Sequence, residues 1–403
     1  MKPFRDTVIV CLALCLLAQP ARALPGNQAA SDPDTRPIVL VGGLDYQSDH
    51  SAALYLLRVA FAVGDGTLLL TAAHCVDQFL DPPRGVATRL LFVISPYYGD
   101  LLPVQVLAID KTVDVAVLKV RWPGPGHPAY ALADPNTLAP GQAVAVPSRP
   151  QFKGEVHRIQ KEVFVEHLTV ERLNAVKPQE GILFTSGGQI ERGWSGSPLL
   201  FQETGQVAGI LCLLKSTTVV RFLLFKHTQV RAAGCSTRDV VPFLRAHRLA
   251  EAVLARPGTY PRIEDGQTVF AQILDFYDAF AGKDPNALRD TTRVLTQSRP
   301  HSAYVQLMSG LGLAWASGSH PDTDALRARV ESRFRTALSR GPNQPEVLSI
   351  YGDILKTRKK YNEAISYTEA ALQQDPNNRL ALLNQLRNLF LDVADISQLQ
   401  PGN

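Results

Sequence analysis

The sequence predicts a chain of two architectures, an all-β region over residues 38–250 followed by an all-α region over residues 265–400. Short β-type runs separated by Gly, Pro and Asp fill the first region, a pattern typical of a sandwich or barrel. In the second region the apolar residues recur at helical spacing. With 403 residues and 45% hydrophobic residues, the chain is long enough for two or three packed domains.

The N-terminal segment is expected to carry targeting information. An apolar run, Val8–Ala18, follows two basic residues and is too short to span a bilayer. Ala21-Arg22-Ala23 then offers small residues at the two positions that a signal peptidase reads. We predict a cleaved secretory signal over residues 1–23 and a flexible leader over residues 24–37, with an uncleaved anchor as the alternative. The protein is therefore expected to be exported, either periplasmic or secreted.

Charge and cysteine content exclude several classes of function. The net charge of +4 is small, and no Lys/Arg stripe is interleaved with aromatic residues, so nucleic acid is not an expected partner. Signal cleavage would leave Cys75, Cys212 and Cys235, an odd number that excludes a dense disulfide framework and leaves their pairing open. No Cys-x-x-Cys or His-x-x-x-His spacing is present, so neither a metal nor a cofactor is expected. No later segment reads as a membrane span.

The β-region is defined by its strand-like runs and by a closing helix. The closing helix is predicted over Arg238–His247, where the β-type pattern ends. Representative strand-like runs are Ile38–Val41, Gly66–Leu70, Arg89–Val93, Val104–Ile109, Val115–Val120, Gln142–Val146 and Val207–Leu211.

The helical region follows a linker predicted over residues 251–264. Ala337 and Pro342 recur 34 residues later as Ala371 and Pro376, a period typical of paired-helix repeats. Residues 345–378 are similar to a tetratricopeptide unit. A degenerate unit with its first helix near Ala303–Trp315 and an extra loop at Gly318–Asp322 is expected before it, as is a further helix pair over about 267–298. Two or three repeats are the prediction, and an unrelated helical bundle is the alternative.

Three short strings carry the candidate chemistry and stand in the order His, Asp, Ser: Thr71–Cys75, Val113–Leu118 and Gly193–Pro198. A histidine, an aspartate and a serine supply the base, the orienting carboxylate and the nucleophile that hydrolysis through an acyl-enzyme requires. Each string alone is a weak signal, but all three in this order are far less common by chance.

The histidine and the aspartate are each placed by a neighbouring strand. His74 ends a predicted buried strand, and its near-neutral pKa suits proton transfer; a buried, hydrogen-bonded structural histidine is the alternative. Asp114 lies among valines, where a carboxylate needs a partner, and an imidazole N–H is the expected one. A strand-entry aspartate is the alternative interpretation, and Asp110 is the second candidate for the orienting carboxylate.

The serine lies in a glycine-rich turn, Gly193-Trp194-Ser195-Gly196-Ser197-Pro198. Glycines on both sides permit a tight bend that presents the Ser195 hydroxyl and backbone N–H groups. The N–H groups of Gly193 and Ser195 would donate to the oxyanion of a tetrahedral intermediate. An inert Gly-Ser loop is the alternative.

On these motifs, residues 38–250 resemble the chymotrypsin-fold, or trypsin-like, serine peptidases. Thr71–Cys75 matches the family's histidine motif, Asp110–Val120 resembles the Deg-type branch, and Gly193–Pro198 is similar to the serine motif of bacterial glutamyl endopeptidases. The resemblance implies two six-stranded antiparallel β-barrels with the catalytic residues in the cleft between them. It also implies His74 as base, Asp114 as orienting carboxylate, Ser195 as nucleophile, and a polypeptide substrate.

The sequence departs from that family at four positions. Trp194 stands where digestive relatives carry an acid that pairs with a newly formed N-terminus, so that mode of activation is not expected. Gln189 lies where trypsins carry an acid, and Leu214 replaces a glycine of the specificity pocket, so a preference for Arg or Lys is not expected. If Cys212 takes the place of the family's serine, Asp114 loses one hydrogen bond.

Two functions from different classes therefore follow from the sequence. The first is an exported serine endopeptidase whose tetratricopeptide-like repeats recruit a substrate or a protein partner. The second is a catalytically silent protease-fold scaffold whose repeats bind protein. A general esterase with the same three residues is a third interpretation.

Overall fold

The computed structural model describes residues 34–386 except 48–50, 55–57, 81–84, 125, 140, 149–163, 173–181, 187–192, 222–224, 256, 258–259, 261–265, 318–323, 341–344 and 379. The predicted signal over residues 1–23 and most of the predicted leader over residues 24–37 lie outside the described residues.

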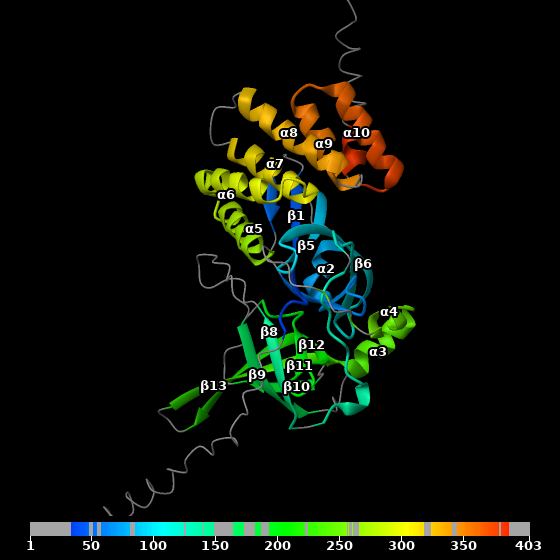
Figure 1. Cartoon of the computed structure of the whole chain (residues 1–403), viewed down its shortest axis with the longest axis vertical. Coiled ribbons are helices and arrows are strands. Elements are labelled where there is room, and N and C mark those ends of the chain that lie inside the picture. The colour runs from blue at the N-terminus through cyan, green and yellow to red at the C-terminus, as the bar shows by residue number, and fades with distance from the viewer. Residues whose placement is uncertain are drawn as a thin grey trace, which may run out of the picture. The chain divides into compact units, whose positions relative to one another are not determined.

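The first β-region folds into an antiparallel sheet with the strand order β2-β1-β3-β4-β7-β6-β5, and β1 also pairs with β5. This extra pairing closes six strands into a ring and leaves β2 as an addition to β1. Alternate residues of β1 enter different apolar clusters, Ile38 and Leu40 in one and Val39 and Val41 in another, so both faces of this strand are buried. The elements are β1 (Ile38–Gln47), β2 (Ala52–Leu54), β3 (Arg58–Val63), β4 (Leu68–Thr71), η1 (Ala73–Cys75), α2 (Asp77–Leu80), β5 (Val86–Ser95), β6 (Asp100–Asp110) and β7 (Val115–Val120) (Figure 1).

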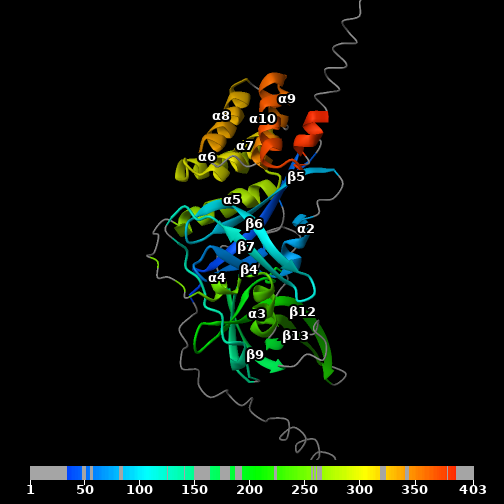
Figure 2. The same ribbon diagram turned by 90° about the vertical axis from the view of Figure 1, so that its right-hand side faces the viewer.

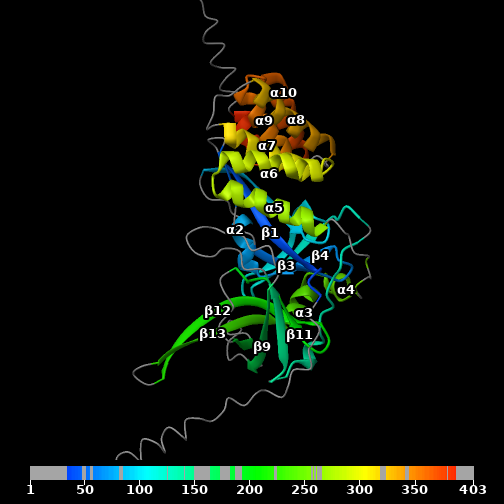
Figure 3. The ribbon, with the colours of Figure 1, turned by 60° about the vertical axis from the view of Figure 1, so that its left-hand side comes forward.

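The second β-region is a closed barrel with the strand order β10-β13-β12-β11-β8-β9. Its core includes Val144, Leu199 and Leu211, which belong to three different strands. The elements are η2 (Pro135–Thr137), β8 (Ala143–Ser148), β9 (Phe164–Arg172), β10 (Ile182–Ser186), β11 (Pro198–Phe201), β12 (Val207–Arg221) and β13 (Phe225–Ser236). The double-barrel fold that the resemblance implied is therefore confirmed, and β12 and β13 run on together as a long hairpin beyond the other strands (Figure 3).

Helices dominate the described chain after the second barrel. The predicted closing helix is present as α3, and the segment expected as a linker contains most of a short helix, α4, whose Val253 is fully buried. In the C-terminal region α5 packs on α6, α7 on α8 and α9 on α10 (Figure 2). The bounds are α3 (Thr237–Ala246), α4 (Ala250–Leu254), α5 (Gly266–Ala281), α6 (Pro285–Ser298), α7 (Ala303–Ser317), α8 (Asp324–Arg340), α9 (Pro345–Thr357) and α10 (Tyr361–Gln374).

Local chemistry fixes the start of α6. Asp284 caps α6, because its side chain accepts from the N–H groups of Asn286 and Ala287 at 3.0 Å each, and Pro285 occupies the first helical position. The extra loop predicted at Gly318–Asp322 falls outside the described residues. No helix in the described part of the chain has the length and apolar content that a membrane span requires.

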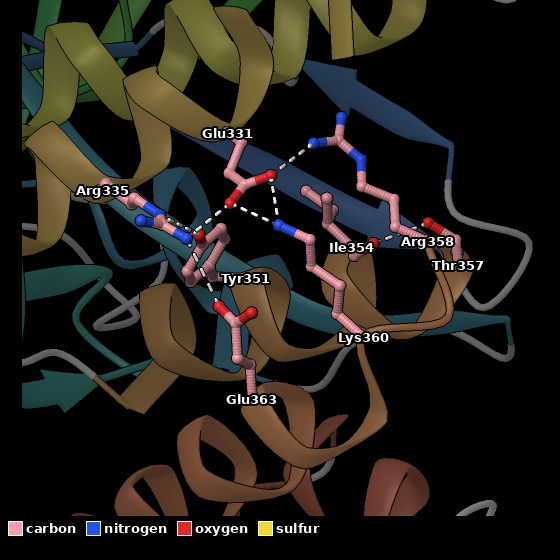
Figure 4. A network of polar contacts seen from close by, with 8 residues as sticks. All are labelled: Glu331, Arg335, Tyr351, Ile354, Thr357, Arg358, Lys360 and Glu363. Atoms are coloured by element: carbon pink, nitrogen blue, oxygen red, sulfur yellow. Dashed lines mark hydrogen bonds and ion pairs between the residues drawn. The ribbon is translucent and has the colours of Figure 1, made fainter. Parts of the chain in front are cut away.

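A group of charged side chains ties α8 to α9 and α10 (Figure 4). The Glu331 carboxylate accepts from Lys360 Nζ at 2.7 and 2.8 Å and from Arg335 at 2.6 Å, and Arg358 lies 3.7 Å away. Burial alone would raise the pKa of Glu331, but the Lys360 hydrogen bond and the surrounding positive charge outweigh it and lower that pKa. Glu331 therefore holds three cationic side chains, Arg335 of α8 itself and Arg358 and Lys360 of the turn between α9 and α10.

The helical region also packs against the first barrel. The Tyr46 hydroxyl of β1 donates to Asp353 Oδ2 of α9 at 3.0 Å, and both residues are buried. Arg299 donates to the carbonyl oxygens of Tyr98 and Gly99 at 3.0 and 3.1 Å. One apolar cluster contains residues from both parts, so the helices extend the core of the first barrel.

Candidate active site

His74 is placed by the strand that precedes it. Leu69 and Leu70 of β4 are fully buried, and the chain then turns into the one-turn helix η1, which carries His74. Buried neighbours on both sides hold its backbone, while its side chain is 46% exposed. The predicted strand-to-helix transition at this histidine is confirmed, and its imidazole is accessible to a reacting group.

Asp114 binds His74 twice. Its Oδ2 accepts from His74 Nδ1 at 2.8 Å, and its Oδ1 accepts from the His74 backbone N–H at 2.9 Å. Asp114 has a φ of +57°, a left-handed conformation that Asp adopts more readily than most residues. Because the carboxylate holds both the ring and the backbone, it fixes the orientation of the imidazole and leaves Nε2 for other partners.

Asp110 has a different role. Its Oδ1 accepts from the backbone N–H groups of Thr112 and Val113 at 2.7 and 3.3 Å, which shapes the turn between β6 and β7. The structure thus pairs the histidine with Asp114 and not with Asp110, the second candidate.

Asp114 also sets the protonation of the histidine. Its hydrogen bond to Nδ1 is the main cause that raises the pKa of His74 to about 10, and a contact with the Cys75 sulfur acts in the same direction. Partial burial opposes the shift but is smaller. The imidazolium form is therefore stabilised. A general base needs such stabilisation of its protonated form when it receives a proton during a reaction.

Ser195 lies in a turn that only glycine permits. Gly193 has a φ of +103° and Gly196 a φ of +90°. Among the hydrogen bonds of the described residues, none engages the N–H of Gly193 or of Ser195, and the Ser195 side chain is partly exposed. The two N–H groups that the sequence predicted for an oxyanion are therefore free of other protein partners in that part of the chain.

The Ser195 hydroxyl donates to the carbonyl oxygen of Cys212 at 3.4 Å, a long and weak bond. In the described part of the chain no hydrogen bond joins Ser195 Oγ to His74 Nε2. The two residues are nevertheless neighbours, because Cys75 Sγ lies 3.8 Å from His74 Nε2 and 3.5 Å from the carbonyl oxygen of Ser195.

The first barrel supports the serine turn through contacts that sequence reasoning missed. Thr71, at the end of β4, is buried and donates from Oγ1 to the carbonyl oxygen of Val59 at 2.7 Å. A Cβ added at Gly196 would overlap both of these oxygens. Thr71 belongs to the histidine string, but the string does not indicate its place under the serine turn. Val59 contributes only a backbone oxygen, which no sequence pattern identifies.

The three cysteines of the described chain are unpaired. Cys212 Sγ donates to the carbonyl oxygens of Ile210 and Asp114, at 3.3 and 3.6 Å, and no bond from it to the Asp114 carboxylate occurs among the described residues. Burial raises the pKa of the Cys212 and Cys235 thiols, so both remain protonated and unreactive.

The remaining predicted site residues have mixed outcomes. Trp194 is buried in the core of the second barrel, where its side chain packs with Leu199 and Leu211. Leu214 occupies β12 opposite Ala232, and its side chain is not described. Gln189 lies outside the described residues, so the predicted specificity pocket stays a prediction.

The arrangement combines an oriented imidazole, a neighbouring hydroxyl and two backbone N–H groups of a glycine turn that have no hydrogen-bond partner among the described residues. Residues 59–210 match a family model described as a trypsin-like peptidase domain. This match contains all three candidate catalytic residues and covers parts of both barrels. A search among curated proteins finds no match to the chain. Residues 59–210 are thus similar to a trypsin-like peptidase domain, and a helical region follows them in the chain.

Proposed function

We propose that this protein is a serine endopeptidase that cleaves polypeptides through an acyl-enzyme. The observation that carries the proposal is the pair of hydrogen bonds from His74 to Asp114. The Cys75 sulfur contacts both His74 Nε2 and the carbonyl oxygen of Ser195, so the serine lies beside this histidine. The match of residues 59–210 to the trypsin-like peptidase domain supports the same chemistry.

The mechanism follows from the positions of these groups. His74 Nε2 takes the proton of the Ser195 hydroxyl as Oγ attacks the substrate carbonyl carbon, and Asp114 stabilises the imidazolium that forms. The N–H groups of Gly193 and Ser195 donate to the oxyanion, and removing one such donor typically costs about 3 kcal/mol of transition-state stabilisation. His74 then gives its proton to the leaving amine, and water hydrolyses the ester by the same sequence.

A catalytically silent scaffold is the second candidate. Two observations favour it. The hydrogen bond to the Cys212 carbonyl oxygen directs the Ser195 hydroxyl away from His74. The raised pKa of His74 keeps its imidazole protonated near neutral pH, where it cannot accept the serine proton. A serine that stays on Cys212, beside a histidine that stays charged, would attack no carbonyl.

Labelling with a fluorophosphonate probe separates the two candidates. The folded full-length protein is expected to be labelled, and Ser195→Ala should abolish the signal while Ser366→Ala, which alters an exposed serine of α10, should keep it. Absence of labelling at every pH at which the protein is folded supports the scaffold. Side-by-side hydrolysis of matched ester and peptide substrates then distinguishes an esterase from an endopeptidase.

The helical region is proposed to bind a protein partner, and the chain is proposed to be exported. Tyr361, Leu382 and Leu386 are exposed apolar side chains of this region, at 42%, 40% and 53%. Replacing all three by serine should abolish capture of the partner in a pull-down while fluorophosphonate labelling persists; unchanged capture would contradict recruitment by these side chains. N-terminal sequencing of the exported protein should begin at Leu24.

A further inference from the structure

Two cysteines contact the candidate catalytic residues, and each contacts Ser195 together with one other member of the set. Cys75 Sγ donates to the carbonyl oxygen of Ser195 at 3.5 Å and lies 3.8 Å from His74 Nε2. The carbonyl oxygen of Cys212 accepts from the Ser195 hydroxyl at 3.4 Å, and its Sγ donates to the carbonyl oxygen of Asp114 at 3.6 Å. The base and the nucleophile are therefore each engaged by a cysteine.

The hydrogen-bonding roles of these atoms form a continuous chain through Cys75. The raised pKa of His74 keeps the imidazole protonated near neutral pH, and both ring nitrogens then donate. Nδ1 donates to Asp114, which leaves the Nε2 proton for the Cys75 sulfur. The thiol proton in turn goes to the Ser195 carbonyl oxygen. Every group in this chain has a partner, and the serine hydroxyl is not among them.

The position of the Cys75 sulfur is fixed by the fold. Cys75 is fully buried, as is the next residue, Val76. The backbone N–H of Cys75 donates to the Ala72 carbonyl oxygen at 3.0 Å, and the N–H of Val76 donates to that of Ala73 at the same distance. The His74 side chain, by contrast, is 46% exposed. The sulfur is thus the fixed partner of this contact.

The strengths of the contacts around His74 differ. Two hydrogen bonds of 2.8 and 2.9 Å join His74 to Asp114, and one of them involves a charged carboxylate and an imidazolium. A thiol sulfur is a weak acceptor, and its separation of 3.8 Å from Nε2 is long. The contact with Cys75 is therefore the easier one to exchange, and its loss leaves Asp114 bound to Nδ1.

We propose that Cys75 is a positioning residue that restrains the resting protein, because its sulfur engages the His74 nitrogen that must take the Ser195 proton. This inference rests on the proposed function, since it concerns the base of the same reaction. Proton transfer requires the serine oxygen within hydrogen-bond reach of Nε2. A bound substrate would have to replace the sulfur by that oxygen.

The other charged groups near η1 are occupied. Asp77 of α2 is paired with Lys111 at 2.6 Å, and Asp110 accepts from backbone N–H groups of its own turn. Among the residues that the structure describes, Asp114 and Cys75 are the ones that shift the pKa of His74, both upward. A change of pKa on substitution of Cys75 therefore reports the sulfur contact itself.

Replacing Cys75 by valine tests the restraint on the full-length protein. Valine fills a similar volume without the sulfur, so the midpoint of the pH profile for fluorophosphonate labelling should move down by about half a pH unit. Labelling at pH 7 should then be about threefold faster, because the neutral fraction of His74 rises about tenfold for each pH unit of lowered pKa. Cys75→Ala should act in the same direction, whereas Cys75→Ser, which keeps a hydrogen-bonding atom, should stay within about twofold of the wild type.

Cys235→Val is the matched control. Cys235 is also a buried thiol, and its Sγ donates to the Ser236 carbonyl oxygen at 3.9 Å. The control should change neither the midpoint nor the labelling rate. A slower Cys75→Val with an unchanged midpoint and a lower Tm would mean that Cys75 only supports the fold, and it would overturn the proposal. An equal shift in the control would overturn it as well.

Titration of the His74 imidazole by NMR separates this inference from the proposed function. The measurement uses Ser195→Ala with and without Cys75→Val, and it requires no activity. A lower pKa in the double variant supports the sulfur contact even if the native protein is never labelled. Labelling of Cys75→Val alone would support the restraint directly. If the native protein is labelled and Cys75→Val changes neither the pKa nor the rate, the inference alone fails. A shifted pKa with an unchanged rate would also overturn it, because the contact would then restrain nothing.

Discussion

Replacing Gly196 with alanine tests how the first barrel positions the nucleophile. Gly196 has a φ of +90°, and a Cβ there would overlap the carbonyl oxygen of Val59 and the Thr71 hydroxyl. The conformation alone costs an alanine about 1–2 kcal/mol. The overlap with a buried backbone atom adds about 1–3 kcal/mol or displaces the turn.

Gly141→Ala is the matched control for this substitution. Gly141 has a φ of +84°, close to that of Gly196, but a Cβ added there meets nothing within 4 Å. The control therefore carries the conformational cost of about 1–2 kcal/mol without the overlap. The difference between the two variants isolates the contact between the serine turn and the first barrel.

The assay is the second-order rate of fluorophosphonate labelling, measured together with the free energy of unfolding. A shift of about 1 Å at Ser195 typically reduces the rate about 100-fold, so Gly196→Ala should fall by that order while Gly141→Ala stays within about twofold. Equal labelling rates in the two variants would refute the claim that Val59 and Thr71 position the serine.

Three further predictions concern charge and pH. Because Asp114 raises the pKa of His74 to about 10, kcat/KM should rise with pH along a curve whose midpoint lies near pH 10. Asp114→Asn should move this midpoint to lower pH. A midpoint near pH 6.5 in the wild-type protein would contradict the raised pKa of His74. Burial lowers the pKa of His127 to about 4, below its ordinary value of 6.5, so its contribution to stability is present above pH 6.5 and is lost as pH falls toward 4. That loss amounts to about 3 kcal/mol and should disappear from denaturant titrations of His127→Gln. Glu331→Gln removes the carboxylate that Arg335, Arg358 and Lys360 share and should reduce the free energy of unfolding by about 1–2 kcal/mol, whereas Glu363→Gln, at an exposed position, should change it by less than about 0.5 kcal/mol.

The order and identity of the candidate catalytic residues can be predicted from the sequence, because each residue lies in a characteristic pattern of only a few neighbouring residues. A histidine after a buried strand and a serine between glycines are short-range patterns, and both recur in the structure as predicted. The choice of carboxylate was not decided in this way. Asp110 and Asp114 are four residues apart in the same turn, and only the packing of that turn against η1 brings Asp114 to Nδ1 and directs Asp110 to the backbone.

The contact between the helical region and the first barrel likewise had no local signal. Tyr46 and Asp353 are 307 residues apart, and each is an ordinary strand or helix residue in its own segment. The sequence predicted paired helices after Pro257, but not which face of the barrel they would cover.

The sequence by itself determined the succession of β-region and helical region, the three reactive side chains and the glycines of the serine turn, since periodicity and turn chemistry act over a few residues. The tertiary structure alone decided which aspartate meets the histidine, which oxygens lie under Gly196, and that Tyr46 of the first barrel meets Asp353 of the helical region. Those features depend on strand register and on contacts between distant segments, which no local pattern encodes.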